Sequence, residues 1–486
     1  MLPTIETLFR TLDAAGVSYC HWKSNWALHR TLMGETDLDL LVGRADARRF
    51  RGILTDLGFE PSMETGGHGT PSTEHHMTLD EATGTIVHVH AYYRVITGES
   101  LSKNYHLPLE EMLLTNTRRE GRVNVPVAGA ELIVFVVRML VKHTTAIEIT
   151  LLMRQWKDVR REVDWLMTQD ALEEARKLLP IWLPNVDEGL FREGYDALKH
   201  PAAVWRRVLL GYRFRRRLRS FRRRHVVRAR AVGIAKFTGV VSHRLIGSTR
   251  KLSPGGGGAV IAFVGSEATG KSTILSTVEA WLAERYTVRR VHAGKPPATG
   301  LTSVPHVLLP AARWLLPDQR FTRVEARQAA DAARTEAPAP LMFAIRSVML
   351  AYERRALLVR AFAHSSDGAI VLCDRYPSSR SGAPDSPQLA QRSAPDQLRR
   401  RLAALETRLY EDIPPPDLVI HLTAPLDVTL ARNAGRGKVE PEDHVRRRHG
   451  LSSDLEFEGT RVRRISTDRP LEDVIREVKD EVWQTL

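Results

Sequence analysis

The sequence predicts an α/β protein built from more than one domain. Its 486 residues exceed what a single hydrophobic core usually serves, so two or three domains are expected. In residues 259–486, short apolar runs alternate with helical stretches, which indicates a parallel sheet covered by helices on both faces. Residues 1–143 mix helix and strand patterns, and residues 144–250 show helical spacing in almost every window. A mixed α+β domain and a helical layer are therefore expected before the parallel sheet.

Periodicity and composition also predict individual elements. A helix is expected at Ile5–Ala15, and strands are expected at Asp37–Val42 and Thr85–Tyr92. The strands of the parallel sheet are predicted at Val260–Val264, Val288–His292, Ala369–Cys373 and Leu418–Leu422. Residues 251–258 end in four consecutive glycines, which have no side chain to pack, so this segment is predicted to be a flexible linker.

Charge and cysteine content narrow the class of protein. The net charge of +14 is concentrated between Tyr212 and Arg230, where ten arginines occur without an acidic residue. Cys20 and Cys373 lie far apart, which excludes a disulfide framework and fits a reducing cytoplasm. The start of the chain lacks the pattern of a signal peptide, and the apolar stretches fall short of the ~20 residues that a spanning helix needs. A cytoplasmic protein without a membrane anchor is expected.

A glycine-rich phosphate-binding motif follows the first strand of the predicted parallel sheet. Its residues are Gly265, Ser266, Glu267, Ala268, Thr269, Gly270, Lys271 and Ser272. They fit the P-loop pattern G-x-x-x-x-G-K-[ST] and precede a helical stretch that starts at Thr273. In such a loop, backbone amides and the helix N-terminus face the phosphates of ATP. Residues 265–273 are therefore predicted to bind ATP, with Lys271 on the β- and γ-phosphates and Ser272 on Mg²⁺.

A second motif, Asp374-Arg375-Tyr376, lies at the end of another predicted strand of this sheet. Ligand-facing residues of an open α/β sheet belong at the carboxyl ends of its strands. Asp374 is therefore predicted to organise Mg²⁺, and Arg375 to hold a phosphate. The tripeptide alone would more often be a structural ion pair, but its place after a P-loop favours the functional interpretation.

These motifs resemble the thymidylate kinase family of P-loop nucleoside monophosphate kinases over most of residues 260–486. Asp374-Arg375-Tyr376 matches the phosphoacceptor motif of that family, Pro416–Leu422 resembles its later core strand, and Ile465-Ser466-Thr467 resembles its closing strand. Three further residues resemble its cationic lid: Arg432, Arg436 and Lys438. The chain departs from the family at His292–Pro297, where the family has an Arg-Glu-Pro-Gly type of loop.

The resemblance implies ATP-dependent phosphoryl transfer with Mg²⁺ to a nucleotide-like acceptor, either a nucleoside monophosphate such as dTMP or a related phosphorylated metabolite. The implied catalytic residues are Lys271, Asp374, Arg375, Arg432 and Arg436. The implied acceptor-binding residues are Glu267, Arg354, Arg375 and Tyr376. A homodimer is also implied by the resemblance alone.

Two carboxylates near the N-terminus suggest a second site. Asp37 and Asp39 lie on one face of a predicted strand, because side chains alternate with period two, and such a pair can hold metal ions. The stretch from Trp22 to Val42, with Lys23 and Ser24 near the phosphate-handling position, resembles the nucleotidyltransferase superfamily. His88 stands where that superfamily has a third acid, so a catalytically weakened enzyme or a binding module is expected.

The histidines near this second site have two interpretations. His68, His75, His76, His88 and His90 could form a metal cluster, or they could be polar residues of a solvent-facing hairpin with one buried histidine. No standard metal-ligand spacing is present among them. The hairpin is the simpler interpretation.

The arginine-rich segment at residues 212–230 is predicted to be a basic amphipathic helix. Its apolar stripe is Leu210, Phe214, Leu218 and Phe221, and arginines from Arg213 to Arg224 fill the other positions. Such a helix can lie on an anionic membrane surface, bind RNA, or pack its apolar stripe on its own domain. The sequence thus leaves two alternatives to the kinase: a nucleotidyltransferase acting through Asp37 and Asp39, and an ATP-gated protein that binds nucleic acid or a membrane.

Overall fold

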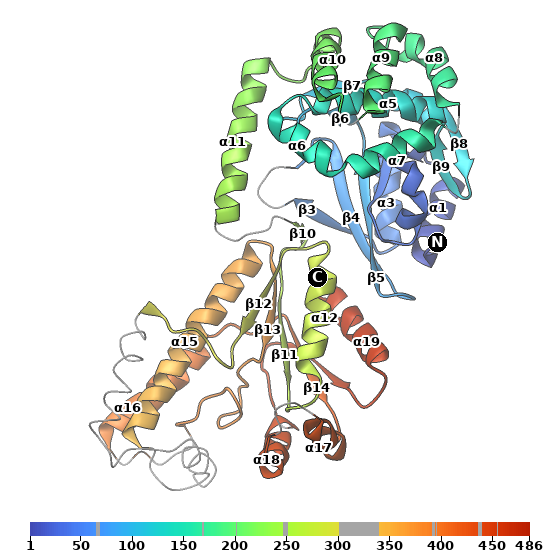
Figure 1. The fold of residues 1–486 in the computed structure, drawn as a ribbon. Coiled ribbons are helices and arrows are strands. Elements are labelled where there is room, and N and C mark those ends of the chain that lie inside the picture. The colour runs from blue at the N-terminus through green and yellow to red at the C-terminus, as the bar shows by residue number, and fades with distance from the viewer. Residues whose placement is uncertain are drawn as a thin grey trace. The chain divides into compact units, whose positions relative to one another are not determined.

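The computed structural model describes residues 1–64, 69–167, 170–200, 202–245, 251–300, 340–390, 394, 396–435, 440–453 and 455–486. Contacts between residues divide the chain into two compact units, Met1–Arg250 (unit 1) and Lys251–Leu486 (unit 2). The protein is mixed α/β, with a mixed sheet in unit 1 and a parallel sheet in unit 2 (Figure 1). Within the described ranges, no helix is both long enough and apolar enough to cross a membrane.

Unit 1 begins with alternating helices and strands and ends in helices alone. Its strands are β1 (Tyr19–His21), β2 (Leu38–Val42), β3 (Glu60–Glu64), β4 (Thr73–Asp80), β5 (Thr85–Tyr92), β6 (Val95–Thr97), β7 (Tyr105–Leu107), β8 (Thr117–Glu120) and β9 (Val123–Pro126). Its α-helices are α1 (Pro3–Ala14), α2 (Leu28–Leu32), α3 (Ala47–Asp56), α4 (Glu110–Thr115), α5 (Ala128–Lys142), α6 (Ala146–Arg154), α7 (Trp156–Met167), α8 (Ala171–Trp182), α9 (Glu188–Leu198), α10 (Val204–Arg217) and α11 (Val226–Leu245). The predicted first helix and first strand thus differ from α1 and β2 by one or two residues at their ends, and the predicted strand Thr85–Tyr92 matches β5.

The main sheet of unit 1 separates an apolar face from a polar one. Its strands run in the order β1-β2-β5-β4-β3, with β2 parallel to β5 and the other pairs antiparallel. Leu38, Leu40 and Val42 pack with buried residues of α1 and α3 on one face. Because side chains alternate along a strand, Asp37 and Asp39 belong to the opposite face. The register places Asp39 beside His90 on β5.

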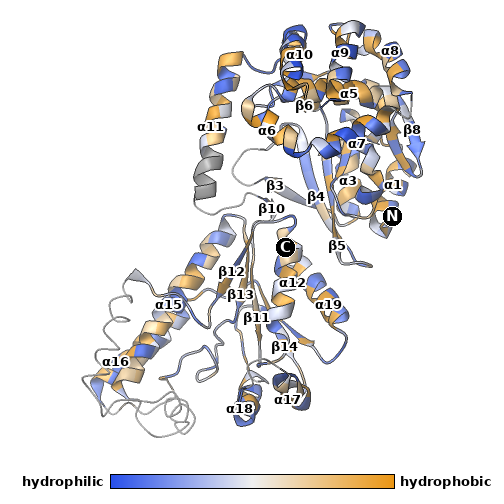
Figure 2. Ribbon diagram, viewed as in Figure 1, coloured by the Kyte–Doolittle hydropathy of each residue, from blue (hydrophilic) through white to orange (hydrophobic). Residues whose placement is uncertain are grey.

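Helix α5 is the centre of the second core of unit 1. Nearly all of its residues are buried, and it packs against α8, α9 and α10. Figure 2 shows hydrophobic residues along this helix. A helix that is apolar on most sides is buried by neighbours on most sides. The helical residues after position 143 therefore share one core with the residues before them.

The arginine-rich helix is shorter than the sequence predicted. Helix α10 ends at Arg217, and Arg222 is extended, whereas the apolar and basic pattern predicted one helix across residues 212–230. The backbone of this segment is held by tertiary hydrogen bonds instead: Arg223 N donates to the Asn104 carbonyl at 2.9 Å, and the Asn104 side chain donates to the Arg224 carbonyl at 3.0 Å. Local periodicity carries no information about such a partner.

Unit 2 alternates strands and helices. Its strands are β10 (Leu252–Pro254), β11 (Val260–Gly265), β12 (Val288–His292), β13 (Ile370–Asp374), β14 (Leu418–Thr423) and β15 (Arg461–Ser466). Within the described ranges, its α-helices are α12 (Lys271–Ala283), α15 (Leu341–Ser366), α16 (Gln397–Glu411), α17 (Leu426–Ala434), α18 (Glu442–Ser453) and α19 (Leu471–Trp483). The four strands that the sequence predicted for this sheet are present, and their ends agree within one residue.

The sheet of unit 2 is parallel throughout, in the order β12-β13-β11-β14-β15. Figure 1 shows α15 and α16 on one side of this sheet and α12 and α19 on the other. Val260, Ala262 and Val264 of β11 pack with Leu358 and Ala361 of α15 in one buried cluster. The carboxyl ends of all five strands meet at one edge of the sheet, which is where ligands bind in open α/β sheets.

The glycine-rich segment before β11 is held against unit 2. The amide of Gly258 donates to the Ser365 carbonyl at 3.0 Å, and a Cβ atom at Gly258 would lie 2.0 Å from the Ala369 carbonyl oxygen. Gly258 is thus a close-packing glycine at the start of the sheet. This differs from the unpacked hinge that composition predicted, because composition does not show which backbone a glycine approaches.

Candidate functional site

The P-loop lies between the end of β11 and the start of α12. Gly265, Ala268 and Gly270 have positive φ angles of 142°, 61° and 83°, which turn the chain from strand to helix. A Cβ atom at Gly265 would lie 2.2 Å from the Leu422 carbonyl oxygen of β14, so the position requires glycine. The Lys271 ammonium donates to the Gly265 carbonyl at 2.9 Å and also to the Ser266 carbonyl. The loop therefore holds its own lysine beside the N-terminus of α12.

The remaining predicted ATP-binding residues follow directly in the loop and the helix. The Thr269 hydroxyl donates to the Ser266 carbonyl at 2.9 Å, inside the loop. The first turn of α12 contributes Ser272 and Thr273, which are exposed. Exposed hydroxyls at a helix N-terminus are available to a phosphate or to a metal bound to one.

Asp374 ends the strand next to the P-loop strand. In the register of β11 with β13, Asp374 lies opposite Phe263, and Arg375 N donates to the Phe263 carbonyl at 3.0 Å. The Asp374 carboxylate contacts His292 Nδ1 at 3.1 Å and an Arg290 nitrogen at 3.8 Å, both from β12. The carboxylate therefore stands at the ligand-binding edge of the sheet, one strand away from the P-loop.

The predicted acceptor residues share a partner that the sequence analysis did not identify. Arg354 of α15 and Arg375 both contact Asp385, at 2.5 Å and 3.2 Å. Arg354 also donates to the Ala293 carbonyl at 2.9 Å and to the Tyr410 hydroxyl at 2.7 Å. These contacts bring the two arginines together around one carboxylate.

Tyr376 is placed differently from the other acceptor residues. Its ring is buried in the cluster that includes Val371 and Val419, and its hydroxyl donates to the Pro414 carbonyl. Burial raises the pKa of this hydroxyl far above its usual value. The ring supports the loop after Asp374 and shares with Tyr410 the wall of a cavity of about 480 Å³.

The loop at which the chain departs from the thymidylate kinase pattern contacts Asp374, Arg354 and Arg375. His292 contacts Asp374, and the Ala293 carbonyl accepts from Arg354. A Cβ atom at Gly294 would lie 2.5 Å from Cδ of Arg375, so the absent side chain makes room for that arginine. The departure therefore changes the immediate surroundings of the predicted acceptor residues.

Arg432 of α17 is tied to the last strand of the sheet. Its guanidinium donates to the Thr467 hydroxyl at 3.0 Å and to the Thr467 carbonyl at 2.8 Å. The two other predicted lid residues, Arg436 and Lys438, lie outside the described residues. The contact ties α17 to the residue that follows β15, and the lid function of Arg432 stays a prediction.

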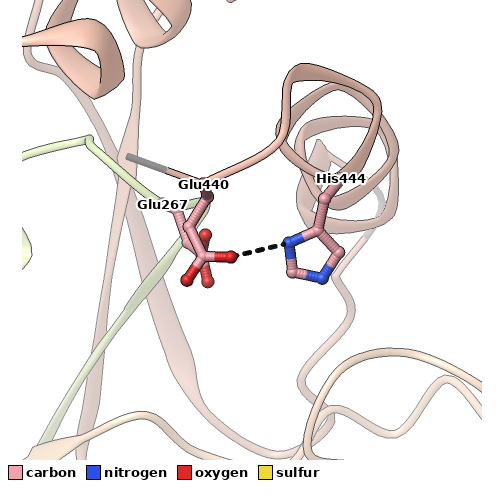
Figure 3. Close-up of side chains that lie close together, drawn as sticks. All are labelled: Glu267, Glu440 and His444. Atoms are coloured by element: carbon pink, nitrogen blue, oxygen red, sulfur yellow. Dashed lines mark ion pairs between the residues drawn. The ribbon is translucent and has the colours of Figure 1, made fainter. Parts of the chain in front are cut away.

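Glu267 belongs to a charged cluster beside the P-loop. Among the described residues, Glu267, Glu440 and His444 form the group of possible metal ligands whose atoms all lie within 4.8 Å of one another (Figure 3). Glu440 contacts His444 Nδ1 at 3.4 Å, and Glu267 forms an ion pair with Arg448. The cluster therefore contains its own cation, and it ties the loop to α18.

The sequence analysis assigned Glu267 to the acceptor and missed its three neighbours. Glu440, His444 and Arg448 follow each other at intervals of four residues, which is the spacing of one helix face. This spacing of four residues could have identified Glu440, His444 and Arg448 as a group in the sequence. Asp385 gave no comparable signal, because it lies in an irregular loop.

In unit 1, the polar face of the sheet brings together most of the predicted second site. Asp37 contacts His88 Nδ1 at 2.9 Å, His88 Nε2 contacts His75 Nδ1 at 2.9 Å, and His75 Nε2 contacts Glu64 at 3.2 Å. The chain of contacts crosses four neighbouring strands, from β2 to β3. His76 belongs to a different group, because its ring contacts Glu74 at 3.3 Å. His68 lies outside the described residues.

Asp39 is compensated by protein groups. Its carboxylate contacts the Lys23 ammonium at 3.0 Å and His90 Nδ1 at 3.3 Å. Burial opposes ionisation of Asp39, but the Lys23 charge together with the hydrogen bond and charge of His90 holds the pKa of the carboxyl below its usual range. Burial lowers the pKa of Lys23 and lowers that of His90 to about 4. The pair is thus an internal ion pair in a low-dielectric site.

These contacts fit a metal poorly. Across the described part of unit 1, no three carboxylate, imidazole or thiol ligand atoms lie within 4.8 Å of one another. Asp39 would have to release Lys23 before it could bind a cation, and Asp37 already contacts His88. His88 therefore acts as a partner of Asp37 in this structure.

Three arginines of residues 212–230 form ion pairs within unit 1. Arg215 contacts Glu99 at 2.9 Å, Arg217 contacts Asp187 at 3.1 Å, and Arg213 contacts Glu193 at 2.6 Å. The predicted apolar stripe faces inward: Leu210, Phe214 and Leu218 are buried, and Phe221 packs against the same core. Helix α10 therefore packs this stripe on its own unit. Its outward side carries Trp205, Leu209 and Tyr212, which are exposed.

Comparison with known proteins found a distant similarity to proteins named as ATP-binding. No protein-family profile matches the sequence. A protein of Escherichia coli strain K12 named "Uncharacterized ATP-binding protein YghR" is 23% identical over 227 residues, which are 46% of this chain and 86% of that protein. The protein of the same name from Escherichia coli O6:H1 strain CFT073 shows the same identity and coverage. The chain is thus distantly similar to a protein described as binding ATP.

Proposed function

We propose that unit 2 is an ATP-dependent phosphotransferase that moves the γ-phosphoryl group of ATP to a nucleotide-like acceptor. The observation that carries the proposal is the register of β11 with β13, which sets Asp374 one strand away from the P-loop at the ligand-binding edge of a parallel sheet. The similarity to a protein named as ATP-binding supports the choice of donor. The resemblance to thymidylate kinases supports the choice of reaction.

The P-loop would hold the phosphates of ATP through its backbone amides and through the ammonium group of Lys271. Lys271 would leave the carbonyls of Gly265 and Ser266 and contact the β- and γ-phosphates, where it would offset negative charge that develops during transfer. Arg375 would hold the acceptor, and Arg432 would approach the donor from α17. Catalysis would then be mostly positioning and charge neutralisation.

Mg²⁺ fits the oxygen ligands at this edge of the sheet. Ser272 is exposed in the first turn of α12, and Asp374 presents a carboxylate on the neighbouring strand. Hydroxyl and carboxylate oxygens are ligands that Mg²⁺ accepts together with phosphate oxygens. The ion would supply charge neutralisation on the phosphates.

Isotope labelling tests the proposal directly. The full chain would be incubated with Mg²⁺ and either γ-labelled or α-labelled ATP, and with nucleosides, nucleoside monophosphates or sugar phosphates as acceptors. Transfer of the γ-label to an acceptor is expected. Transfer of the α-label would instead support the alternative, nucleotidyl transfer through Asp37 and Asp39. Absence of both transfers across the acceptor panel would contradict the kinase assignment.

The two alternatives have less support from the contacts. Nucleotidyl transfer in unit 1 would require Asp39 to exchange Lys23 for a metal. Binding of RNA or an anionic membrane by an ATP-gated protein would have to use the outward side of α10, because the predicted apolar stripe is buried. The cytoplasmic location, which is inferred from cysteine usage, and the homodimer, which is inferred from family resemblance, also remain proposals.

A further inference from the structure

Arg354 has little capacity left to bind a substrate. Its side chain is 5% exposed, and each of its three nitrogens already has an acceptor: the Ala293 carbonyl, the Tyr410 hydroxyl and Asp385. A buried guanidinium is stable when its donors are satisfied in this way. Arg354 therefore holds the loop, the helix and Asp385 together.

Asp385 places negative charge between the two arginines of the predicted acceptor site. One carboxylate oxygen contacts Arg354 and the other contacts Arg375 at 3.2 Å. Asp385 is 13% exposed, whereas Arg375 is 31% exposed, so Arg375 is the arginine that solvent and ligands reach. Two guanidinium charges and one carboxylate leave a net charge of about one at this point.

The loop that carries Asp385 is fixed in place by its own hydrogen bonds. Ser378 N donates to the Ser386 hydroxyl at 2.8 Å, and the Gln388 and Leu389 amides donate to one oxygen of Glu406 at 3.0 Å and 2.8 Å. Glu406 lies on α16 and is 1% exposed. Releasing this loop would leave a buried carboxylate without those donors, which is costly. Asp385 is therefore held in a fixed position in the proposed acceptor site.

The charge of the acceptor follows from this arrangement. A phosphate monoester carries roughly −1.5 to −2 charges at neutral pH, and at Arg375 it would lie close to the Asp385 carboxylate. A hydroxyl, or a group with a single negative charge, meets less repulsion there. Resting on the proposed function, we infer that Asp385 is a specificity-determining residue: it makes the site favour nucleotide-like acceptors that present a neutral or singly charged group to Arg375 over those that present a phosphate dianion.

Binding measurements on the full chain test this inference. The P-loop would be saturated with Mg²⁺ and a non-hydrolysable ATP analogue, because a P-loop also binds phosphate. Inorganic phosphate would then be titrated by calorimetry into the wild type and Asp385→Asn. Thymidine and dTMP would be titrated into the wild type. Asp412→Asn is the matched control, because Asp412 pairs with the neighbouring Arg355 at 3.0 Å and its loss removes the same charge from unit 2.

Asp385→Asn is expected to bind phosphate about tenfold more tightly than the wild type, the scale of one charge-assisted hydrogen bond. Adding Arg375→Gln should remove that gain, and Asp412→Asn should show none. Equal or weaker binding by folded Asp385→Asn would overturn the inference. If Asp385→Asn does not fold, the affinities of the wild type for dTMP and thymidine test the inference. An affinity for dTMP no higher than that for thymidine supports the inference, and an affinity about tenfold higher overturns it.

These results are separable from the proposed function. Loss of γ-label transfer to every acceptor would contradict the kinase assignment. The phosphate affinities of the wild type and of Asp385→Asn are measured without phosphoryl transfer, so they would still test the role of Asp385.

Discussion

Replacing Lys271 with alanine would separate its proposed catalytic role from its structural one. In the structure its ammonium donates hydrogen bonds to the Gly265 and Ser266 carbonyls, and its side chain is half-buried. Each such bond contributes roughly 0.5–1.5 kcal/mol, so the variant should lose about 1–3 kcal/mol of the unfolding free energy. A domain stable by about 5–15 kcal/mol remains folded after such a loss.

The expected catalytic loss is larger. Removing one preorganised group that stabilises transition-state charge costs about 2.7–4 kcal/mol, which lowers kcat by roughly 10²–10³. The assay is release and transfer of label from γ-labelled ATP, with circular dichroism to verify the fold.

Lys479→Ala is the control, because its ammonium lies over the Trp281 ring, 5.1 Å from the ring centroid, and its loss removes the same charge from unit 2. A folded Lys271→Ala protein with turnover within about threefold of the wild type would refute the reasoning, since the role assigned to Lys271 requires a loss near the scale above.

Three further predictions concern Gly265, Asp374 and Glu131. Gly265→Ala should destabilise unit 2 by about 2–4 kcal/mol, because the new Cβ atom would collide with the Leu422 carbonyl and because the φ angle of Gly265 is 142°. Gly256→Ala is the control and should not destabilise unit 2, since the nearest atom to its Cβ would be 3.8 Å away. Equal denaturation midpoints for the two variants would contradict the prediction. Asp374→Asn should lower turnover about 10²-fold, and a raised Mg²⁺ concentration should restore part of the lost turnover. If Mg²⁺ changes the turnover of neither the wild type nor Asp374→Asn, Asp374 does not hold the metal. Burial raises the pKa of Glu131 from 4.5 to about 8, so the stability that its protonated form contributes is present below pH 4.5 and lost as pH rises through 8. Glu131→Gln should flatten this loss in chemical denaturation across that pH range, and an unchanged slope would contradict it.

The sequence by itself determined the local architecture of unit 2. The apolar run before Gly265, the glycine spacing and the helical pattern after Ser272 act over a few residues, and they predicted both ends of β11 and the start of α12 within two residues. The alternation of strands and helices predicted a parallel sheet, because parallel strands need crossover helices. That rule in turn predicted that Asp374 would lie at the same edge as the P-loop.

The partners of these residues were decided by tertiary structure. Asp385 meets Arg354 across 31 residues, and Glu267 meets Arg448 across 181 residues, and neither contact has a local period that reveals it. The backbone at Arg223 and Arg224, beyond the end of α10, is likewise held by Asn104, 120 residues before Arg224. Periodicity reports which face of an element is buried, but it does not report which loop returns to that face. The charge of the proposed acceptor site therefore depends on the path of a loop, and only the folded chain shows it.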